Sequence, residues 1–173
     1  MHSALRAVFA RAGIDSWQGP TIAAASVLVL IDLARRAWPD RPGRAWVAGA
    51  FLAVSTQVLV TSMTMYAMPT HLLFALVWLW LYARDARWSV ALLPWVGFLA
   101  VGVHSPFPHL LFIPVFWLRY LRRRRIATAA YIAVVYALAI VFWQQVFVGW
   151  FDVHVPTASA FAMYFDLVNL AEE

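Results

Sequence analysis

The sequence predicts an all-α fold: a polytopic helical membrane protein with about six transmembrane helices and an interfacial helix at each end. The first observation behind this prediction is composition, because 64% of the 173 residues are hydrophobic and 12% are charged. Soluble domains are about one-half apolar and one-quarter charged, and this chain has too few polar groups to cover a soluble surface. The second observation is that apolar runs close to the roughly 17 residues that cross a bilayer alternate with short polar connections. We therefore expect residues 1–173 to form a single membrane domain.

Residues 1–16 are predicted to lie in the membrane interface, because their apolar residues follow helical spacing and their arginines fall on other faces. A frayed tail is the alternative. The first predicted span, 20–38, contains one acid, Asp32. Arg35 and Arg36 follow it on the same helix face, which favours a salt-paired acid near the interface over a proton relay.

The second predicted span, 45–61, follows the loop 39–44, in which two prolines and a glycine interrupt the helix. It contains a buried-looking polar cluster, Ser55-Thr56-Gln57. We interpret this cluster as hydrogen-bonding to a neighbouring helix, and the alternative is that it lines a polar path.

Four further spans are predicted at 69–83, 88–104, 108–121 and 126–149, and residues 150–173 are predicted to form an outer-face tail with a short interfacial helix. A proline inside the span 88–104 permits a kink, and the span 108–121 is short for a bilayer. Aromatic residues before a basic loop are typical of the membrane interface. The span 69–83 is therefore predicted to end in an aromatic belt of Trp78, Trp80 and Tyr82.

The arginines predict the orientation. The chain has 13 basic residues and no lysine, which is typical of a GC-rich bacterial genome. All but Arg6 and Arg11 fall in three connections, 34–44, 83–88 and 119–125, on one side of a six-span alternation. Basic loops stay in the cytoplasm, so we expect a bacterial inner-membrane protein with both termini on the periplasmic side.

Several function classes are excluded by the sequence. With no cysteine there is no disulfide, thiolate metal site or cysteine nucleophile. The net charge of +5 resides in short loops rather than in a long basic stretch interleaved with aromatics, so nucleic acid is not an expected partner. No phosphate-binding loop, dinucleotide fingerprint or zinc-protease helix is present, and no cofactor is predicted.

The candidate site is a group of polar residues on the predicted outer face. Imidazoles and hydroxyls at the membrane surface are suited to hydrogen-bonding a lipid-linked phosphate. The residues proposed for this role are His71, His104, Ser105 and His109. A metal site completed by Asp152 or His154 is disfavoured, because the spacing of His104 and His109 is not a recognised ligand spacing. The simpler alternative is that such residues cap helix ends at the headgroup level.

Three segments carry a family resemblance: GPTIAAASVLVLIDLARRAW, AWVAGAFLAVSTQVLVTSMTMYAMPTHLLFALVWLWLYAR and HSPFPHLLFIPVFWL. Their order and loop character resemble the middle membrane region of bacterial GT-C-class glycosyltransferases. The resemblance implies a polyprenyl-phosphate-linked sugar donor, an outward-facing active site and a catalytic acid in the first outer loop. That loop and the first two spans have no counterpart here, so no catalytic residue is placed, and Asp15 is not given the role.

The leading expectation is therefore a partial or truncated membrane glycosyltransferase of GT-C type that lacks activity alone, with a partner protein as one source of the missing spans. A non-catalytic polytopic scaffold or assembly subunit is the alternative. A small transporter ranks third, because apart from Gln57 and Pro114 the sequence shows little sign of polar residues at mid-membrane depth or of paired broken helices.

Overall fold

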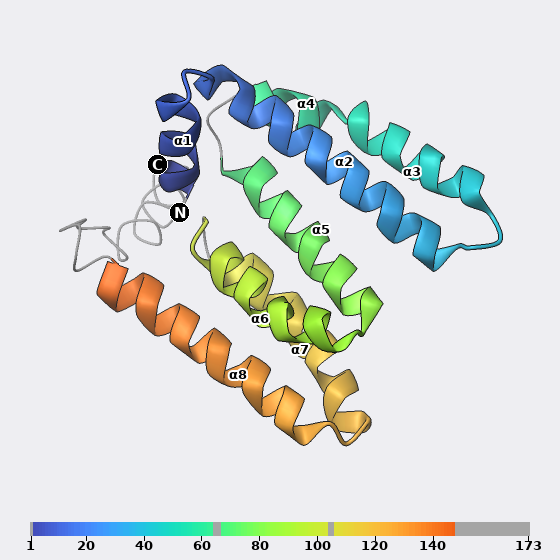
Figure 1. The fold of residues 1–173 in the computed structure, drawn as a ribbon, viewed down its shortest axis with the longest axis vertical. Helices are drawn as coiled ribbons and strands as arrows, with labels where there is room; N and C mark the ends of the chain where they lie inside the picture. Colours follow the sequence, from blue (N-terminus) through green and yellow to red (C-terminus); the bar gives the residue numbers. More distant parts are fainter. Residues whose placement is uncertain (1, 64–66, 104–105, 148–173) are drawn as a thin grey trace, which may run out of the picture. The chain divides into compact units, whose positions relative to one another are not determined.

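The described part of the chain is entirely helical and contains no strand, as predicted. The computed structural model describes residues 2–63, 67–103 and 106–147 (Figure 1). The elements in chain order are α1 (His2–Arg11), the short 3-10 helix η1 (Asp15–Trp17), α2 (Gln18–Ala37), α3 (Pro42–Ala53), α4 (Thr56–Met63), α5 (Met68–Arg84), α6 (Arg87–Val101), α7 (Pro106–Arg122), α8 (Ile126–Val141) and the π-helix η2 (Phe142–Val146).

The chain divides into two compact units, Met1–Ile140 and Val141–Glu173. The second unit begins inside the predicted span 126–149, and most of its residues, including the predicted tail 150–173, lie outside those described. The single membrane domain therefore stays a prediction.

The described helices differ in whether they are long enough to cross a membrane. Within the described residues, one continuous segment, Asp15–Ala37, is long and apolar enough to cross a membrane, and the pair α3 and α4 adds a second if it counts as one bent span. Helices α6 and α8 are apolar but shorter. A helix of 15 residues such as α6 covers about 23 Å of the roughly 30 Å hydrocarbon layer. The six spans stay a prediction.

Helix α2 is the centre of the first half of the unit Met1–Ile140, because it packs against both α3 and α5. The contact with α3 is close, since a Cβ added at Gly49 would lie 2.5 Å from Cγ1 of Ile31. Helix α5 packs in turn against α6, and α6 against α7, with successive helices running in alternating directions (Figure 1). Gly97 of α6 lies against Tyr136 of α8 in the same way. Small residues let helix backbones approach closely.

The predicted aromatic belt is wrong at Trp78. This side chain is only 1% exposed, stacks on Tyr82 with ring centroids 5.6 Å apart and meets the edge of Phe116 in α7. Trp80 lies on a different face, where the Arg84 guanidinium lies 4.1 Å from its ring centroid. Residues four apart share a helix face and residues two apart do not, so Trp78 belongs to the core and the half-buried Tyr82 lies on the same face of α5.

The predicted salt pairing of Asp32 is confirmed. Its Oδ2 atom accepts a hydrogen bond from Nε of Arg36 at 2.9 Å and another from Nε1 of Trp80 at 2.5 Å. The partner is Arg36 rather than Arg35, whose guanidinium instead lies 5.0 Å from the ring centroid of Trp46. A single acid thus joins α2 to α5.

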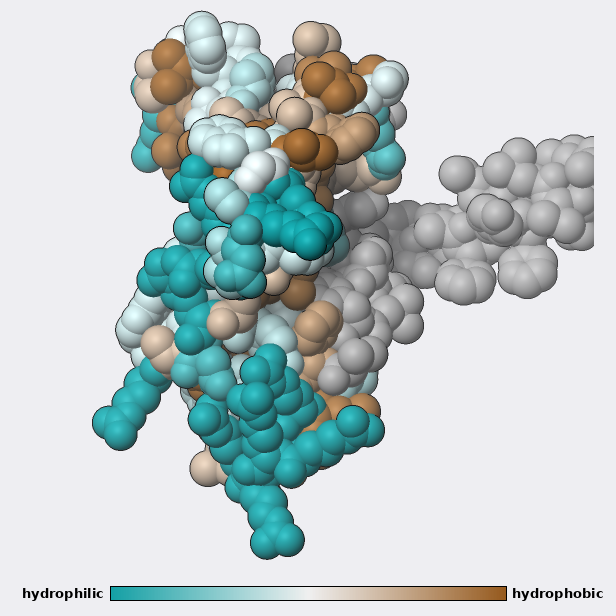
Figure 2. All heavy atoms as spheres, turned by 90° about the vertical axis from the view of Figure 1, so that its right-hand side faces the viewer, coloured by the Kyte–Doolittle hydropathy of each residue, from teal (hydrophilic) through white to brown (hydrophobic). Residues whose placement is uncertain are grey.

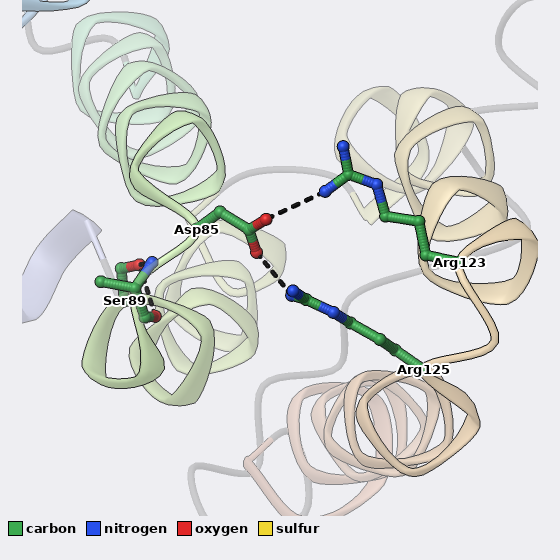
Figure 3. A network of polar contacts seen from close by, with 5 residues as sticks. Asp85, Ser89, Arg123 and Arg125 are labelled. Atoms are coloured by element: carbon green, nitrogen blue, oxygen red, sulfur yellow. Dashed lines mark hydrogen bonds and ion pairs between the residues drawn. The ribbon is translucent and has the colours of Figure 1, made fainter.

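The three arginine-bearing turns lie on one side of this unit. These are the α2–α3, α5–α6 and α7–α8 turns (Figure 1). Figure 2, which looks onto that side, shows hydrophilic residues gathered there. Two of the turns are joined directly, because Asp85 accepts hydrogen bonds from Arg123 at 3.0 Å and Arg125 at 2.8 Å (Figure 3).

Candidate functional site

A break in the second predicted span creates the candidate site. Helix α3 ends at Ala53, α4 begins at Thr56, and the two are bent by 51°. At the break the backbone N–H of Ser55 donates to the carbonyl of Leu52, three residues back, instead of four. The helical pattern of hydrogen bonds to the fourth residue back resumes where the backbone N–H of Leu59 donates to the carbonyl of Ser55. Serine and threonine offer the backbone alternative hydrogen bonds, which makes such a cluster a natural place for a helix to end.

This break corrects the interpretation of residues 55–57. The cluster was expected to be buried against a neighbouring helix, but Thr56 and Gln57 are exposed and Ser55 is half-buried. None of the three makes a side-chain hydrogen bond to another helix in the described part of the chain. The alternative interpretation fits better, because Ser55 and Gln57 line a cavity.

The cavity has a volume of about 290 Å³ and lies among α2, the α3–α4 break and the start of α5. Its apolar lining comes from Ala23, Leu52, Val58, Met68, Pro69 and Leu72, and its polar lining from Ser26, Ser55, Gln57 and Thr61. The volume is at the small end of ligand pockets, which are about 300–1,000 Å³ and mostly apolar with a few convergent polar groups.

Two of the hydroxyl groups that line the cavity, those of Ser26 and Thr61, donate to carbonyls of their own helices. Oγ of Ser26 donates to the carbonyl of Ile22 at 2.8 Å, and Oγ1 of Thr61 donates to the carbonyl of Gln57 at 2.6 Å. A hydroxyl that donates in this way keeps its oxygen as an acceptor. The side-chain amide of Gln57 makes no hydrogen bond with another described residue, so its two N–H donors and its oxygen are available.

Among the described residues, none that lines this cavity is charged. The site therefore offers neutral donors and acceptors on an apolar wall, which suits hydroxyl groups, amides and hydrocarbon. A phosphate would need charge-assisted donors, and those are absent from the lining.

Comparisons of this chain with protein-family models, with curated proteins and with solved structures give no match.

The four residues predicted to bind a lipid-linked phosphate are only partly described. His71 is half-buried in the first turn of α5, and its backbone N–H donates a hydrogen bond to the carbonyl of Ala67. Met68 and Leu72 beside it line the cavity, but His71 does not. His104 and Ser105 lie outside the described residues, and the side chain of His109 does too. Their gathering with His71 stays a prediction.

Metal ligation gains no support from the described residues, which contain no group of three or more histidine, aspartate or glutamate side chains placed to hold an ion. Asp152 and His154 lie outside those residues.

Sequence reasoning missed Ser26, which is fully buried in α2 and lines the cavity. A signal was present, because Ser26 is the one hydroxyl residue in the apolar run 22–31. A lone serine in such a run usually donates to a carbonyl of its own helix, as it does here, so its second role as a lining residue depends on the position of α4 and α5.

Proposed function

We propose that this chain is part of a polytopic inner-membrane glycosyltransferase of GT-C type, and that the cavity at the α3–α4 break holds part of a polyprenyl-phosphate-linked sugar donor. The proposal includes six spans, with the arginine-bearing turns in the cytoplasm and both termini in the periplasm. The observation that carries it is the cavity itself, whose neutral polar and apolar lining suits a sugar or an isoprenoid segment.

Exposed apolar side chains support the membrane part of the proposal. Phe51 on α3 is 72% exposed and Val54 just after it 68%, Met63 on α4 is 83% exposed and Leu28 on α2 is 67% exposed. Contact of such surfaces with hydrocarbon is favourable, whereas their exposure to water costs a free energy of roughly 25 cal/mol per Å² of apolar area. The proposed bilayer removes this penalty.

The location of the cavity supports the outward direction of the proposed site. Its lining comes from the first half of α2, from α4 and from the first turns of α5. The arginine-bearing turns lie beyond the other ends of α2 and α5. With those turns in the cytoplasm, the cavity opens in the outer half of the bilayer.

A binding measurement tests the proposal. The detergent-solubilised chain is titrated with a decaprenyl-phosphate hexose, with decaprenyl phosphate and with a short alkyl glycoside, and binding is followed by native mass spectrometry. We expect the decaprenyl-phosphate hexose to bind most tightly, and Gln57→Leu to weaken it by about tenfold, equivalent to the loss of roughly 1.4 kcal/mol.

Thr56→Leu is the matched control, because Thr56 is equally exposed beside Gln57 but does not line the cavity. Equal effects of the two variants, or no preference for the decaprenyl-phosphate hexose, would contradict the proposal.

The break between α3 and α4 also favours a second candidate, a small transporter, because broken helices with polar lining are typical of transporter substrate sites. A single bent pair is found in the described residues, whereas transporters of that kind have corresponding broken helices in two halves. Uptake of sugars or amino acids into proteoliposomes that is abolished by Gln57→Leu would favour this candidate over the glycosyltransferase.

A further inference from the structure

We propose that a second hollow, at the α2–α3 turn, binds the headgroup phosphate of an anionic phospholipid. This hollow has a volume of about 300 Å³. It is lined by Ala37, Trp38, Pro39, Asp40, Arg41 and Arg44. It lies where α2 ends and α3 begins, at the opposite end of α2 from the cavity described above.

The arginines near this turn form two groups: engaged arginines, whose side chains contact another described residue, and unengaged arginines, whose side chains make no such contact. Arg36 is paired with Asp32, and Arg35 lies over the ring of Trp46. Arg41 and Arg44 are exposed, and neither side chain makes a hydrogen bond, ion pair or ring contact with another described residue. Two guanidinium groups in one hollow are thus available to an added anion.

The charge of the hollow suits a phosphodiester. Asp40 lines it as well but forms no ion pair with either arginine among the described residues, so the lining has one net positive charge. A phosphodiester carries one negative charge, and guanidinium groups bind phosphate oxygens in pairs of parallel hydrogen bonds. The first turn of α3 adds the positive end of a helix dipole at the same place.

The surroundings favour a lipid over other anions. Trp38, which lines the hollow, is 47% exposed, and Trp46, two residues after Arg44, is 59% exposed. Tryptophan is enriched at the headgroup level of membranes. The helical segment Asp15–Ala37, long and apolar enough to cross a bilayer, ends at this point. A lipid headgroup in the hollow would therefore leave its acyl chains beside the exposed apolar face of α3, which includes Val47 and Phe51.

This inference depends on the proposed membrane embedding but not on the proposed glycosyltransferase activity. Its test measures lipid binding in a neutral bilayer, so it is able to fail while donor binding at the other cavity succeeds, and the reverse also holds.

The experiment reconstitutes the full chain in phosphatidylcholine nanodiscs and measures exchange of a fluorescent phosphatidylglycerol into the first lipid shell. The double variant Arg41→Gln/Arg44→Gln removes both unengaged arginines of the hollow. The matched control Arg122→Gln/Arg124→Gln removes two arginines at the end of α7 and in the α7–α8 turn, which are also exposed and make no side-chain contact with another described residue but do not line this hollow. Both variants lose the same net charge.

We expect the hollow variant to weaken phosphatidylglycerol binding by about tenfold or more and the control variant to weaken it by less than about threefold. Equal losses in the two variants would overturn the proposal in favour of general attraction to positive charge. Displacement of the lipid by millimolar inorganic phosphate, or by a short nucleic acid or acidic peptide, would overturn it in favour of a soluble anion. Near-identical circular dichroism of all variants excludes misfolding as the cause.

Discussion

Arg125 donates a hydrogen bond from Nη1 to Oδ1 of Asp85 at 2.8 Å, across 40 residues of sequence (Figure 3). Arg123 occupies the other carboxylate oxygen at 3.0 Å. Asp85 ends α5 in the left-handed region, with φ of 45°, and Arg124 between the two arginines is also left-handed, with φ of 55°. With this backbone geometry, the Asp85 carboxylate accepts hydrogen bonds from two guanidinium groups. These bonds join the α5–α6 turn to the α7–α8 turn.

Replacing Asp85 by asparagine keeps a side chain that tolerates the left-handed conformation and removes the charge. The pairs are partly exposed, with Asp85 25% and the arginines about half exposed, so screening limits their contribution. We expect Asp85→Asn to lower the free energy of unfolding by about 0.5–1 kcal/mol in low salt, and by less in 1 M salt. Thermal denaturation in neutral detergent measures both. The control is Asp40→Asn, since Asp40 forms no ion pair with a described residue; an equal loss there would show that the ion pairs contribute nothing.

Gly97 should tolerate no side chain. A Cβ there would meet the hydroxyl and ring carbons of the buried Tyr136, so alanine forces the Tyr136 ring or the two helices to move. We expect Gly97→Ala to destabilise the protein by roughly 1–3 kcal/mol. Gly43→Ala is the matched control, because nothing lies within 4 Å of a Cβ at that position. Comparable melting temperatures of the two variants would show that α6 and α8 are not packed this closely.

The hydrogen bond from Trp80 to Asp32 should contribute separately from the ring contacts of Trp80. Phenylalanine keeps an aromatic ring beside Arg84 and removes the N–H donor, which leaves Asp32 with Arg36 alone. We expect Trp80→Phe to cost about 1–2 kcal/mol. The ring centroid of Trp88 also lies 5.3 Å from the Arg84 guanidinium carbon, but the indole N–H of Trp88 donates to no described residue. Trp88→Phe should therefore cost clearly less, and an equal or larger cost would place the stabilisation in the cation–π contacts.

The sequence predicted helix positions well where prolines and charges mark the ends. The predicted span 20–38 corresponds to α2 at Gln18–Ala37, and 69–83 corresponds to α5 at Met68–Arg84. The break inside 45–61 was not predicted, because the average hydropathy of a segment carries no information on where its helical backbone hydrogen bonds are interrupted. Likewise Trp78 and Trp80 are alike in hydropathy, and only the packing of α5 against α7 separates the core residue from the peripheral one.

The candidate site was less predictable than the helices. The polar character of residues 55–57 was visible, but their position beside Ser26 and the first turn of α5 depends on a 51° bend that no local pattern specifies. The pairing of Asp32 with Arg36 was predictable because both lie on one helix, whereas the 48-residue contact with Trp80 was not.

The most direct test of the central claim is the orientation of the two ends of the bundle in the membrane. The chain has no cysteine, so single cysteines serve as reporters. Met63, at the end of α4, is 83% exposed, and Arg124 is exposed in the α7–α8 turn. A membrane-impermeant thiol reagent applied to intact spheroplasts should label Met63→Cys, and should label Arg124→Cys only after the membrane is opened. Labelling of Arg124→Cys from outside, or of both positions from one side, would contradict a membrane domain with its arginine-bearing turns in the cytoplasm and its cavity facing outward.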